Sequence, residues 1–159
     1  MEEEFIIRQA AAEDMPLVLS LIRELAVYEK LEDQVEATLG TLNEWIVEKQ
    51  KAEVLIGVWN NEPVGYALFF HNFSTFLGRS GIYLEDIYIR PSARGNGFGK
   101  ALFRHLAALC LKRGCGRLEW CCLDWNKPSI DFYRFMGAKA MDEWTVYRLS
   151  ETQLQELIK

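Results

Sequence analysis

The stretch Arg94-Gly95-Asn96-Gly97-Phe98-Gly99-Lys100 lies between a predicted strand and a predicted helix, and it decides the fold that we expect. Its three glycines allow the backbone to approach a ligand closely, and the first N–H groups of the helix point outward at its positive end. Such a loop forms a cradle for an anion and suits a pyrophosphate. The pattern lacks the Gly-Lys-Ser/Thr of a P-loop and does not follow the first strand, as a dinucleotide-binding turn does. The glycines alone are also compatible with a simple tight turn.

Basic residues surround this loop. The segment from Arg90 to Leu118 contains seven Lys or Arg residues and no Asp or Glu, whereas the rest of the chain carries a charge of −12. An acidic protein with one basic segment is a poor general binder of nucleic acid, so we expect no nucleic-acid partner. The segment suits a single compact anion, and a solvated basic helix face is the alternative.

The bulk composition predicts one domain over residues 1–159, with half of the residues apolar. No run approaches the roughly 20 apolar residues that span a bilayer, so we expect no membrane partner. The start Met1-Glu2-Glu3-Glu4 is unlike a signal peptide. The four cysteines show no Cys-x-x-Cys spacing and only two histidines are present, which predicts no metal site. These features predict a cytoplasmic protein.

Hydrophobic periodicity predicts an α/β fold, with a mixed central sheet flanked by helices in the order β-α-α-β-β-β-α-β-α-β-β. Helices are expected after a cap at Glu13 or Asp14, within 35–49, from Pro91 to Gly114, from Asn126 to Gly137, and in the tail from Glu151. Strands are expected at 5–8, 53–59, 64–70, 81–89, 117–123 and 144–149, with another between Gly137 and Trp144.

With these elements in place, the sequence resembles the GNAT superfamily of N-acetyltransferases. The family signature Arg/Gln-x-x-Gly-x-Gly/Ala is matched by Arg94, Gly97 and Gly99, and the element order agrees over nearly the whole chain. Three further stretches look like the spermidine/spermine and thialysine acetyltransferase branch, and are closer to its thialysine side. They are Leu25-Ala26-Val27-Tyr28-Glu29, Tyr83-Leu84-Glu85-Asp86, and Asp124-Trp125-Asn126 followed by Phe132-Tyr133.

The resemblance implies acetyl-CoA as co-substrate, a small amine as acceptor and a homodimer. In the family, the glycine loop binds the pyrophosphate of coenzyme A, and the preceding strand holds the pantetheine arm. The coenzyme-binding residues expected on this basis are Ile87, Tyr88, Ile89, Arg94, Gly95, Asn96, Gly97, Phe98, Gly99, Lys100, Asn126, Lys127, Pro128 and Ser129.

The resemblance also assigns two catalytic residues. A primary amine has a pKa near 10.4, so only about one molecule in ~10³ is nucleophilic at neutral pH. Tyr133 is expected to donate a proton to the departing sulfur. Glu85 is expected to receive the proton of the amine through a water, from the strand face of Ile87 and Ile89 if side chains alternate. Without the resemblance, Tyr133 fits a core aromatic residue and Glu85 a surface carboxylate paired with an arginine.

The acceptor pocket is expected, by family position, to include Tyr28 and Glu29. Converging carboxylates favour a cationic acceptor. The spermidine enzyme carries an aspartate where this chain has Ser74 or Thr75, which favours a shorter amine, a diamine or an amino acid side chain. The full set of expected acceptor residues is Tyr28, Glu29, Glu85, Glu119, Trp120, Cys121 and Glu143.

Direct transfer within a ternary complex is the expected route, because Cys121 and Cys122 have no histidine nearby in the sequence to activate them. Two alternatives keep the fold. One is an enzyme that acetylates a protein amino group, and the other is a module that binds coenzyme A without catalysis.

Overall fold

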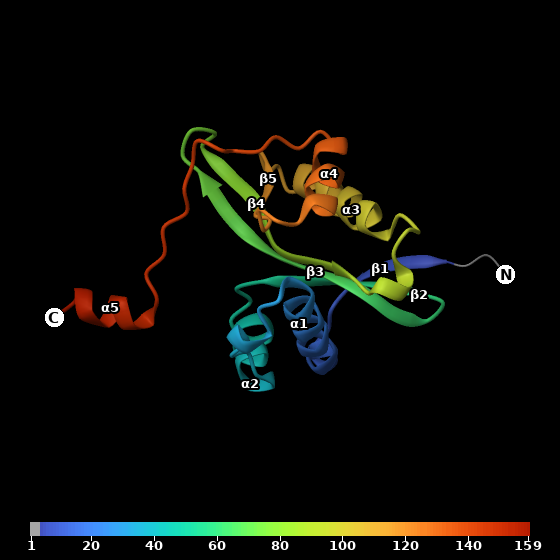
Figure 1. Ribbon diagram of the computed structural model, residues 1–159, viewed down its shortest axis with the longest axis horizontal. Coiled ribbons are helices and arrows are strands. Elements are labelled where there is room, and N and C mark those ends of the chain that lie inside the picture. The colour runs from blue at the N-terminus through green and yellow to red at the C-terminus, as the bar shows by residue number, and fades with distance from the viewer. Residues whose placement is uncertain (1–3) are drawn as a thin grey trace. The chain divides into compact units, whose positions relative to one another are not determined.

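A computed structural model describes residues 4–159, which form an α/β structure around one five-stranded sheet (Figure 1). The chain divides into two compact units, one ending at Cys121 and the other starting at Cys122. The sheet belongs to the first unit, with its strands in the order β1-β2-β3-β4-β5. Neighbouring strands are antiparallel, except that β4 and β5 are parallel, so the sheet is mixed as predicted.

The predicted order of elements is confirmed through the fifth strand. Helices α1 and α2 lie on one face of the sheet, and α3 lies on the other (Figure 1). The strands are β1 (Phe5–Gln9), β2 (Glu53–Trp59), β3 (Glu62–Ser74), β4 (Arg79–Ile89) and β5 (Leu118–Trp120). The helices of this unit are α1 (Met15–Glu29), α2 (Leu39–Leu42), which continues into the π-helical η3 (Asn43–Glu48), and α3 (Phe98–Lys112).

The main core lies between α1 and the sheet. Met15, Val18 and Leu21 recur at helical spacing and pack with Ile56 and Tyr66 of the strands. All five side chains are at most 1% exposed, so burial of this apolar stripe stabilises the position of α1.

An ion pair also ties α1 to the end of β4. The guanidinium of Arg90 donates to the carboxylate of Glu24, with Nη2–Oε1 at 2.8 Å, and to the carbonyl of Pro63. Helix α1 ends at Lys30, which has a left-handed conformation with φ 61°. Tyr28, near the end of α1, packs against the core that α1 shares with the sheet.

The pairing of β3 with β4 contains a bulge. Leu68 pairs with Asp86, but the next residue, Phe69, pairs with Leu84, so Glu85 has no partner across the ladder. The extra residue places Leu84 and Asp86 on opposite faces, although they are only two positions apart. The regular alternation that grouped Glu85 with Ile87 and Ile89 is therefore broken at this point.

The second unit contains α4 (Lys127–Phe135) and α5 (Glu151–Leu157). The side chain of Asn126 accepts a hydrogen bond from the N–H of Ser129 and caps α4, as predicted. Gly137, with φ 89°, ends the helix. The predicted helical tail is confirmed by α5.

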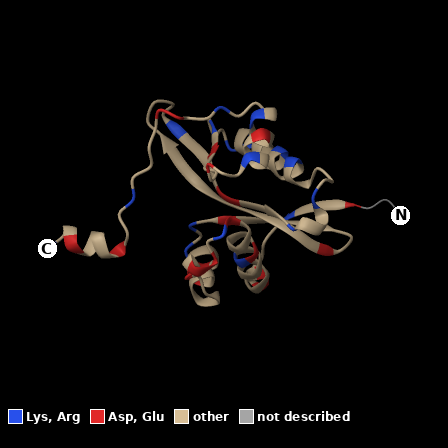
Figure 2. Cartoon of the chain, viewed as in Figure 1, with Lys and Arg blue, Asp and Glu red and all other residues tan. Residues whose placement is uncertain are grey.

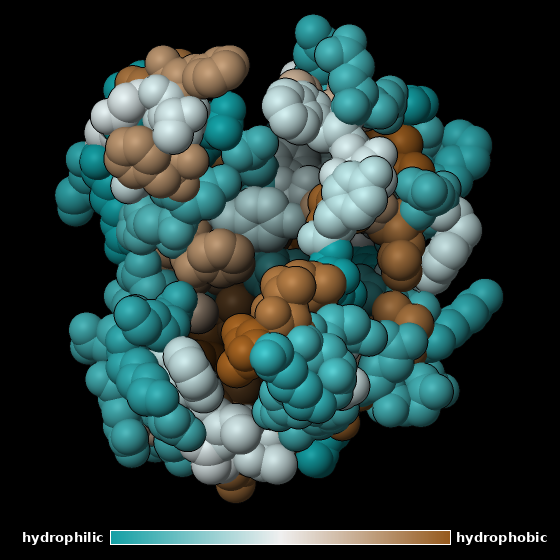
Figure 3. All heavy atoms as spheres, turned by 90° about the vertical axis from the view of Figure 1, so that its left-hand side faces the viewer, coloured by the Kyte–Doolittle hydropathy of each residue, from teal (hydrophilic) through white to brown (hydrophobic). Residues whose placement is uncertain are grey.

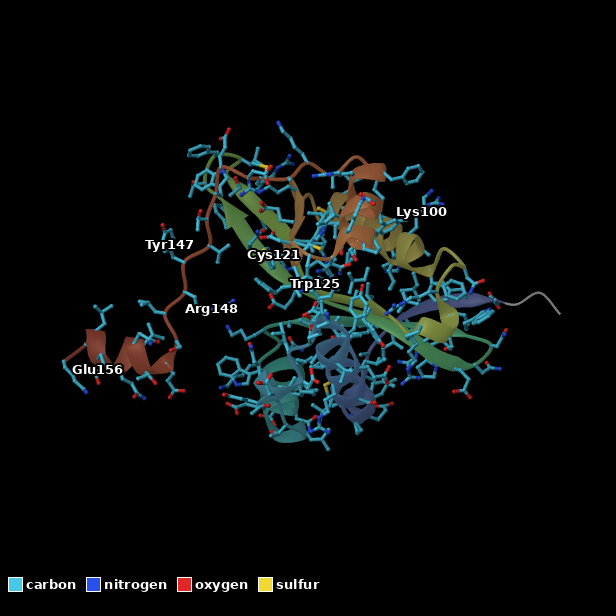
Figure 4. The ribbon with its side chains drawn as sticks, in the orientation of Figure 1. Lys100, Cys121, Trp125, Tyr147, Arg148 and Glu156 are labelled. Carbon is cyan, nitrogen blue, oxygen red and sulfur yellow. The ribbon has the colours of Figure 1, made fainter. Side chains whose placement is uncertain are left out.

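The two strands expected between Gly137 and Leu149 are wrong, and the fifth strand is shorter than expected. Cys121 and Cys122 follow β5 instead of lying on it. Residues 144–149 form no ladder, with Tyr147 91% exposed. Figure 4 shows Tyr147 and Arg148 on this extended stretch. Alternating apolar residues favour a strand, but a strand also needs backbone partners, and residues 4–159 of one chain provide none here.

Membrane-spanning helices, metal-binding groups and disulfides are absent from the described residues. No helix within residues 4–159 is long and apolar enough to cross a membrane. Over the same residues, no group of His, Cys, Asp and Glu side chains could hold a metal ion. No disulfide joins the four cysteines, all of which are described.

Gly65 on β3 makes the closest approach to β4, because a Cβ atom there would lie 2.4 Å from the carbonyl oxygen of Tyr88. We expect Gly65→Ala to lower the free energy of unfolding by about 1–3 kcal/mol, since the backbone of β4 must move. In Gly40→Ala, the added Cβ would be 3.7 Å from its nearest neighbour, so this control should be neutral or slightly stabilising. Urea unfolding measures both, and a wild-type midpoint for Gly65→Ala would contradict the close approach.

Candidate functional site

The glycine loop follows β4 and a short turn, and it leads directly into α3. Gly95 and Gly97 have φ angles of 83° and 79°, in the left-handed region that glycine adopts without strain. A Cβ atom placed on Gly95, Gly97 or Gly99 would meet no atom within 4 Å. The loop therefore leaves open space above its backbone, as the approach of a bulky anion requires.

Contacts on both sides hold this loop in place. The Nε of Arg94 donates to the carbonyl of Ile89 at 2.9 Å, and the Nδ2 of Asn96 donates to the carbonyl of Ala93 at 3.1 Å. The ring of Phe98 stacks on that of Phe5, with centroids 4.1 Å apart. A fixed loop at the amino end of a long helix suits the binding of a pyrophosphate.

The basic segment has two roles. Figure 2 shows positive residues, in blue, on α3. Ion pairs join Arg90 to Glu24, Arg113 to Glu53, and Arg117 to Glu119. Part of the basic excess therefore holds the fold together, whereas Arg94 and Lys100 belong to the loop itself.

Arg94 also connects the loop to the predicted acceptor side. Its guanidinium lies over the ring of Tyr28 at 4.8 Å and over the ring of Tyr88 at 5.6 Å. The structure thus brings together a predicted acceptor residue at the end of α1, a predicted coenzyme residue on β4, and the first residue of the glycine signature.

Three carboxyl groups act on one another near the bulge of β4. The hydroxyl of Tyr66 donates to Oδ2 of Asp86 at 2.9 Å. Burial raises the pKa of Asp86, the bond from Tyr66 partly offsets this, and the charge of Glu85 adds to the rise. Burial and the charge of Asp86 raise the pKa of Glu29. No Lys or Arg of the described residues forms an ion pair with any of the three carboxyl groups, so this region would stabilise a bound cation.

Asp86 and Tyr66 were not among the expected site residues. Asp86 belongs to the stretch Tyr83-Leu84-Glu85-Asp86, but regular alternation would place its side chain on the opposite face of the strand from Glu85. The bulge brings Asp86 to the face of Tyr66, and no sequence pattern marks the position of the bulge.

The expected acceptor residues around β5 divide between the two faces of the sheet. Glu119 pairs with Tyr83, whose hydroxyl lies 2.9 Å from Sγ of Cys121. Glu119 is also bound by Nδ2 of Asn72 and by Arg117, so its charge is compensated. Trp120 lies on the opposite face, where its ring packs against Phe103 of α3.

The remaining expected residues belong to the second unit. Tyr133 lies on α4, with its ring centroid 5.9 Å from that of Phe132, and it is half-buried. The first turn of α4 and its cap contain the four expected coenzyme residues of this unit. Glu143 lies in the exposed segment that follows α4. The four residues at the start of α4 are Asn126, Lys127, Pro128 and Ser129.

Ser74, one of the two positions at which the spermidine enzyme carries an aspartate, ends β3. Its side chain is buried, and its Oγ accepts a hydrogen bond from the N–H of Leu77. Ser74 therefore stabilises the β3–β4 turn, and it supplies no charge to a cationic acceptor.

Comparisons with known proteins identify the family of this chain. The acetyltransferase (GNAT) family model matches residues 17–138. The thialysine N-epsilon-acetyltransferase of Bos taurus is 37% identical to this chain, over 96% of each. The L-ornithine N5-acetyltransferase of Arabidopsis thaliana is 44% identical over 60% of this chain and 42% of its own length. Among solved structures, an integron cassette protein from V. cholerae has a TM-score of 0.80 and 25% identity, and the match covers 98% of each chain.

The raised pKa of Asp86 predicts a cost to stability at neutral pH. Between the pKa of the unfolded chain, about 3.9, and the raised value, the folded state keeps a proton that the unfolded state has lost. Stability is therefore greatest below the unfolded pKa and falls as the pH rises through the folded one. We expect Asp86→Asn to raise the urea midpoint at pH 7, with a smaller gain at pH 4.

The control for this prediction is Glu36→Gln, which removes the same charge from an exposed position. It should change stability by less than about 0.5 kcal/mol at either pH. A midpoint for Asp86→Asn at or below that of the wild type at pH 7 would contradict the expected cost.

Proposed function

The chain belongs to the GNAT acetyltransferase family, and from this premise we propose that it acetylates a primary amine of a small cationic acceptor. The family uses acetyl-CoA as co-substrate, so the protein is an acetyl-CoA-dependent N-acetyltransferase. The acceptor class that we propose is a diamine, a polyamine or a thialysine-like amino acid, and the route is direct transfer in a ternary complex.

The observation that carries this acceptor class is the group of Glu29, Glu85 and Asp86. These carboxyl groups come from α1 and β4, and no described Lys or Arg pairs with them. A cationic acceptor would relieve their mutual repulsion. The thialysine and ornithine relatives are both named for acetylating a side-chain nitrogen, which supports an amine of similar kind.

The proposed reaction places the coenzyme along β4 and the glycine loop. The backbone at Gly95, Gly97 and Gly99 borders open space that suits the pyrophosphate, and Ile87 to Ile89 would hold the pantetheine arm. This open space allows the glycine loop to accommodate acetyl-CoA.

The proton transfers are assigned to two residues. The neutral amine nitrogen attacks the thioester carbonyl carbon, an N–C bond forms, and the C–S bond breaks. Glu85 receives the proton of the amine through a water, and Tyr133 donates a proton to the departing sulfur. Glu85 is exposed, which suits exchange with water, and Tyr133 is half-buried on α4.

The acceptor is proposed to be shorter than spermidine. Ser74 supplies no carboxylate at the β3–β4 turn, and the charge of Glu119 is compensated by Arg117. Fewer uncompensated carboxylates along the pocket give a long polycation less to bind.

A homodimer is part of the proposal. Apolar side chains lie at the surface of the molecule, brown in Figure 3. The extended segment before α5 exposes Trp144, Val146 and Tyr147 by 75%, 74% and 91%, and Leu157 at the end of α5 and the following Ile158 are also exposed. Aromatic and aliphatic residues so exposed are typical of an interface between chains.

The proposal also includes a single catalytic domain over residues 1–159 and a cytoplasmic location. The family match runs from α1 to the end of α4, which supports one domain. The absence of a disulfide among the four described cysteines is compatible with a reducing compartment.

Measuring coenzyme A release from acetyl-CoA with a panel of amines tests the reaction. We expect turnover with putrescine, lysine or thialysine to exceed turnover with spermidine. Tyr133→Phe should lower kcat by about 10²–10⁴-fold because the sulfur loses its proton donor. Ser20→Ala, which removes a hydroxyl from an exposed side chain of α1, should keep wild-type activity. Acetyl-CoA binding without turnover of any amine would refute the proposal.

Light scattering after size exclusion tests the dimer. We expect a mass of twice 18.4 kDa for the wild type. Val146→Asp should shift the mass towards that of one chain, because it buries a charge in the proposed contact. Leu111→Asp introduces the same charge at another exposed apolar position, on α3, and should leave the dimer intact. A wild-type protein that runs as a single chain at micromolar concentration would contradict the dimer.

A further inference from the structure

We infer that Tyr66 is a positioning residue for the acceptor, which acts through Asp86, and that the carboxylate of Asp86 holds the ammonium group of the acceptor. The inference rests on the proposed function, because it concerns the acceptor of that reaction. It adds a hydrogen-bonded pair, one residue from each strand beside the bulge, to the expected Glu29 and Glu85.

Packing fixes the position of the Tyr66 hydroxyl. Tyr66 is 0% exposed and belongs to the core between α1 and the sheet, in which Met15 and Val18 are also buried. A buried phenol has little freedom to choose another partner, and its O–H donates to Oδ2 of Asp86. The other oxygen, Oδ1, receives no hydrogen bond from the described residues.

Asp86 lies where a ligand can reach it. It is intermediate in exposure, whereas Tyr66 behind it is fully buried. The bulge turns Asp86 to the face of α1, towards Glu29, while Ile87 remains on the opposite face. Asp86 thus lies directly beside the strand segment that would hold the pantetheine arm.

The groups that face Asp86 come from three elements. Glu29 approaches from α1 and Glu85 lies next to it on β4, and both are acidic. Tyr66 and Tyr88 add phenols, and Arg94 lies over Tyr88 from the glycine loop. Burial and Glu85 raise the pKa of Asp86, and the hydrogen bond from Tyr66 favours its ionised form.

A cation between these groups would satisfy the free oxygen and relieve the repulsion of Glu29 and Glu85. An ammonium group fits, because it is compact and offers three N–H donors to oxygens that only accept. The competing explanation is that Asp86 serves only to satisfy the buried hydroxyl of Tyr66. The two explanations differ in how Asp86 responds to an amine.

The first experiment measures the titration of Asp86 by NMR, in protein with ¹³C-labelled aspartate carboxyl groups and saturated with coenzyme A. The signal of Asp86 is assigned by its loss in Asp86→Asn. We expect putrescine to lower the pKa of Asp86, because a bound ammonium favours the ionised form. An unchanged titration with saturating putrescine would overturn the inference.

The second experiment uses Tyr66→Phe, which keeps the ring in the core and removes only the hydroxyl. We expect the KM for the amine to rise by about tenfold at pH 7, while kcat and the KM for acetyl-CoA stay near wild type. The acidic limb of kcat/KM for the amine should move to higher pH, because Asp86 loses the bond that favours its ionised form. High pH should therefore restore much of the loss.

A double mutant tests whether Tyr66 acts through Asp86. In the Asp86→Asn background, Tyr66→Phe should cause no further rise in the KM for the amine, since Tyr66 acts only through Asp86. Ser20→Ala, on the exposed face of α1, is the control for loss of a hydroxyl. Urea unfolding of each variant confirms that its fold is kept at the assay temperature.

The outcomes separate this inference from the proposed function. If the wild type acetylates amines and Tyr66→Phe keeps its KM and pH profile, the inference fails and the function stands. If putrescine shifts the titration of Asp86 but no amine is acetylated, the function fails, and only the binding of an ammonium group by Asp86 stands. Additive effects of the two substitutions would overturn the role of Tyr66.

Discussion

The bulge between β3 and β4 is the constraint on which the rest of the site depends. One unpaired residue, Glu85, places Leu84 and Asp86 on opposite faces of the sheet. Leu84 can then be buried at 1% exposure, while Asp86 turns to the face that α1 covers. In a regular ladder, Leu84 and Asp86 would lie on the same face, because side chains alternate with a period of two. The bulge thus lets an apolar core and a polar site share one strand.

The same strand joins the two halves of the site. Only four positions separate the bulge at Glu85 from Ile89, whose carbonyl holds Arg94 and so the glycine loop. Gly65 fixes the distance between β3 and this part of β4, since a Cβ atom there would strike the carbonyl of Tyr88. Arg94 then lies over Tyr28 of α1. The proposed acceptor side and the proposed coenzyme side are therefore both positioned by β4, which suits an enzyme that must hold two substrates together.

Local signals made most of the fold predictable. Strand β2 begins and ends where alternation placed it, and the cap at Asn126 and the stops at Gly114 and Gly137 hold because they are set by a few residues. The glycine loop was predictable for the same reason. The bulge was not, because it depends on the register between two strands, and neither Asp86 nor Tyr66 could be selected without it. The prediction of a strand at 144–149 was wrong, because a strand needs a partner strand and a local sequence pattern does not show whether one is present.

Two places in the structure hold arrangements that are unfavourable in an isolated chain. At Glu29 and Asp86, burial opposes the charge of two carboxyl groups, and Glu85 lies beside Asp86. At Trp144 to Leu149, large apolar side chains are exposed in extended backbone. Each arrangement costs free energy in the isolated chain, and each would be relieved by a component that the chain lacks, a cation in the first case and an apolar surface in the second. Conflicts between local chemistry and fold are expected where a protein binds another molecule, so these two places support the proposed amine site and the proposed chain-to-chain contact.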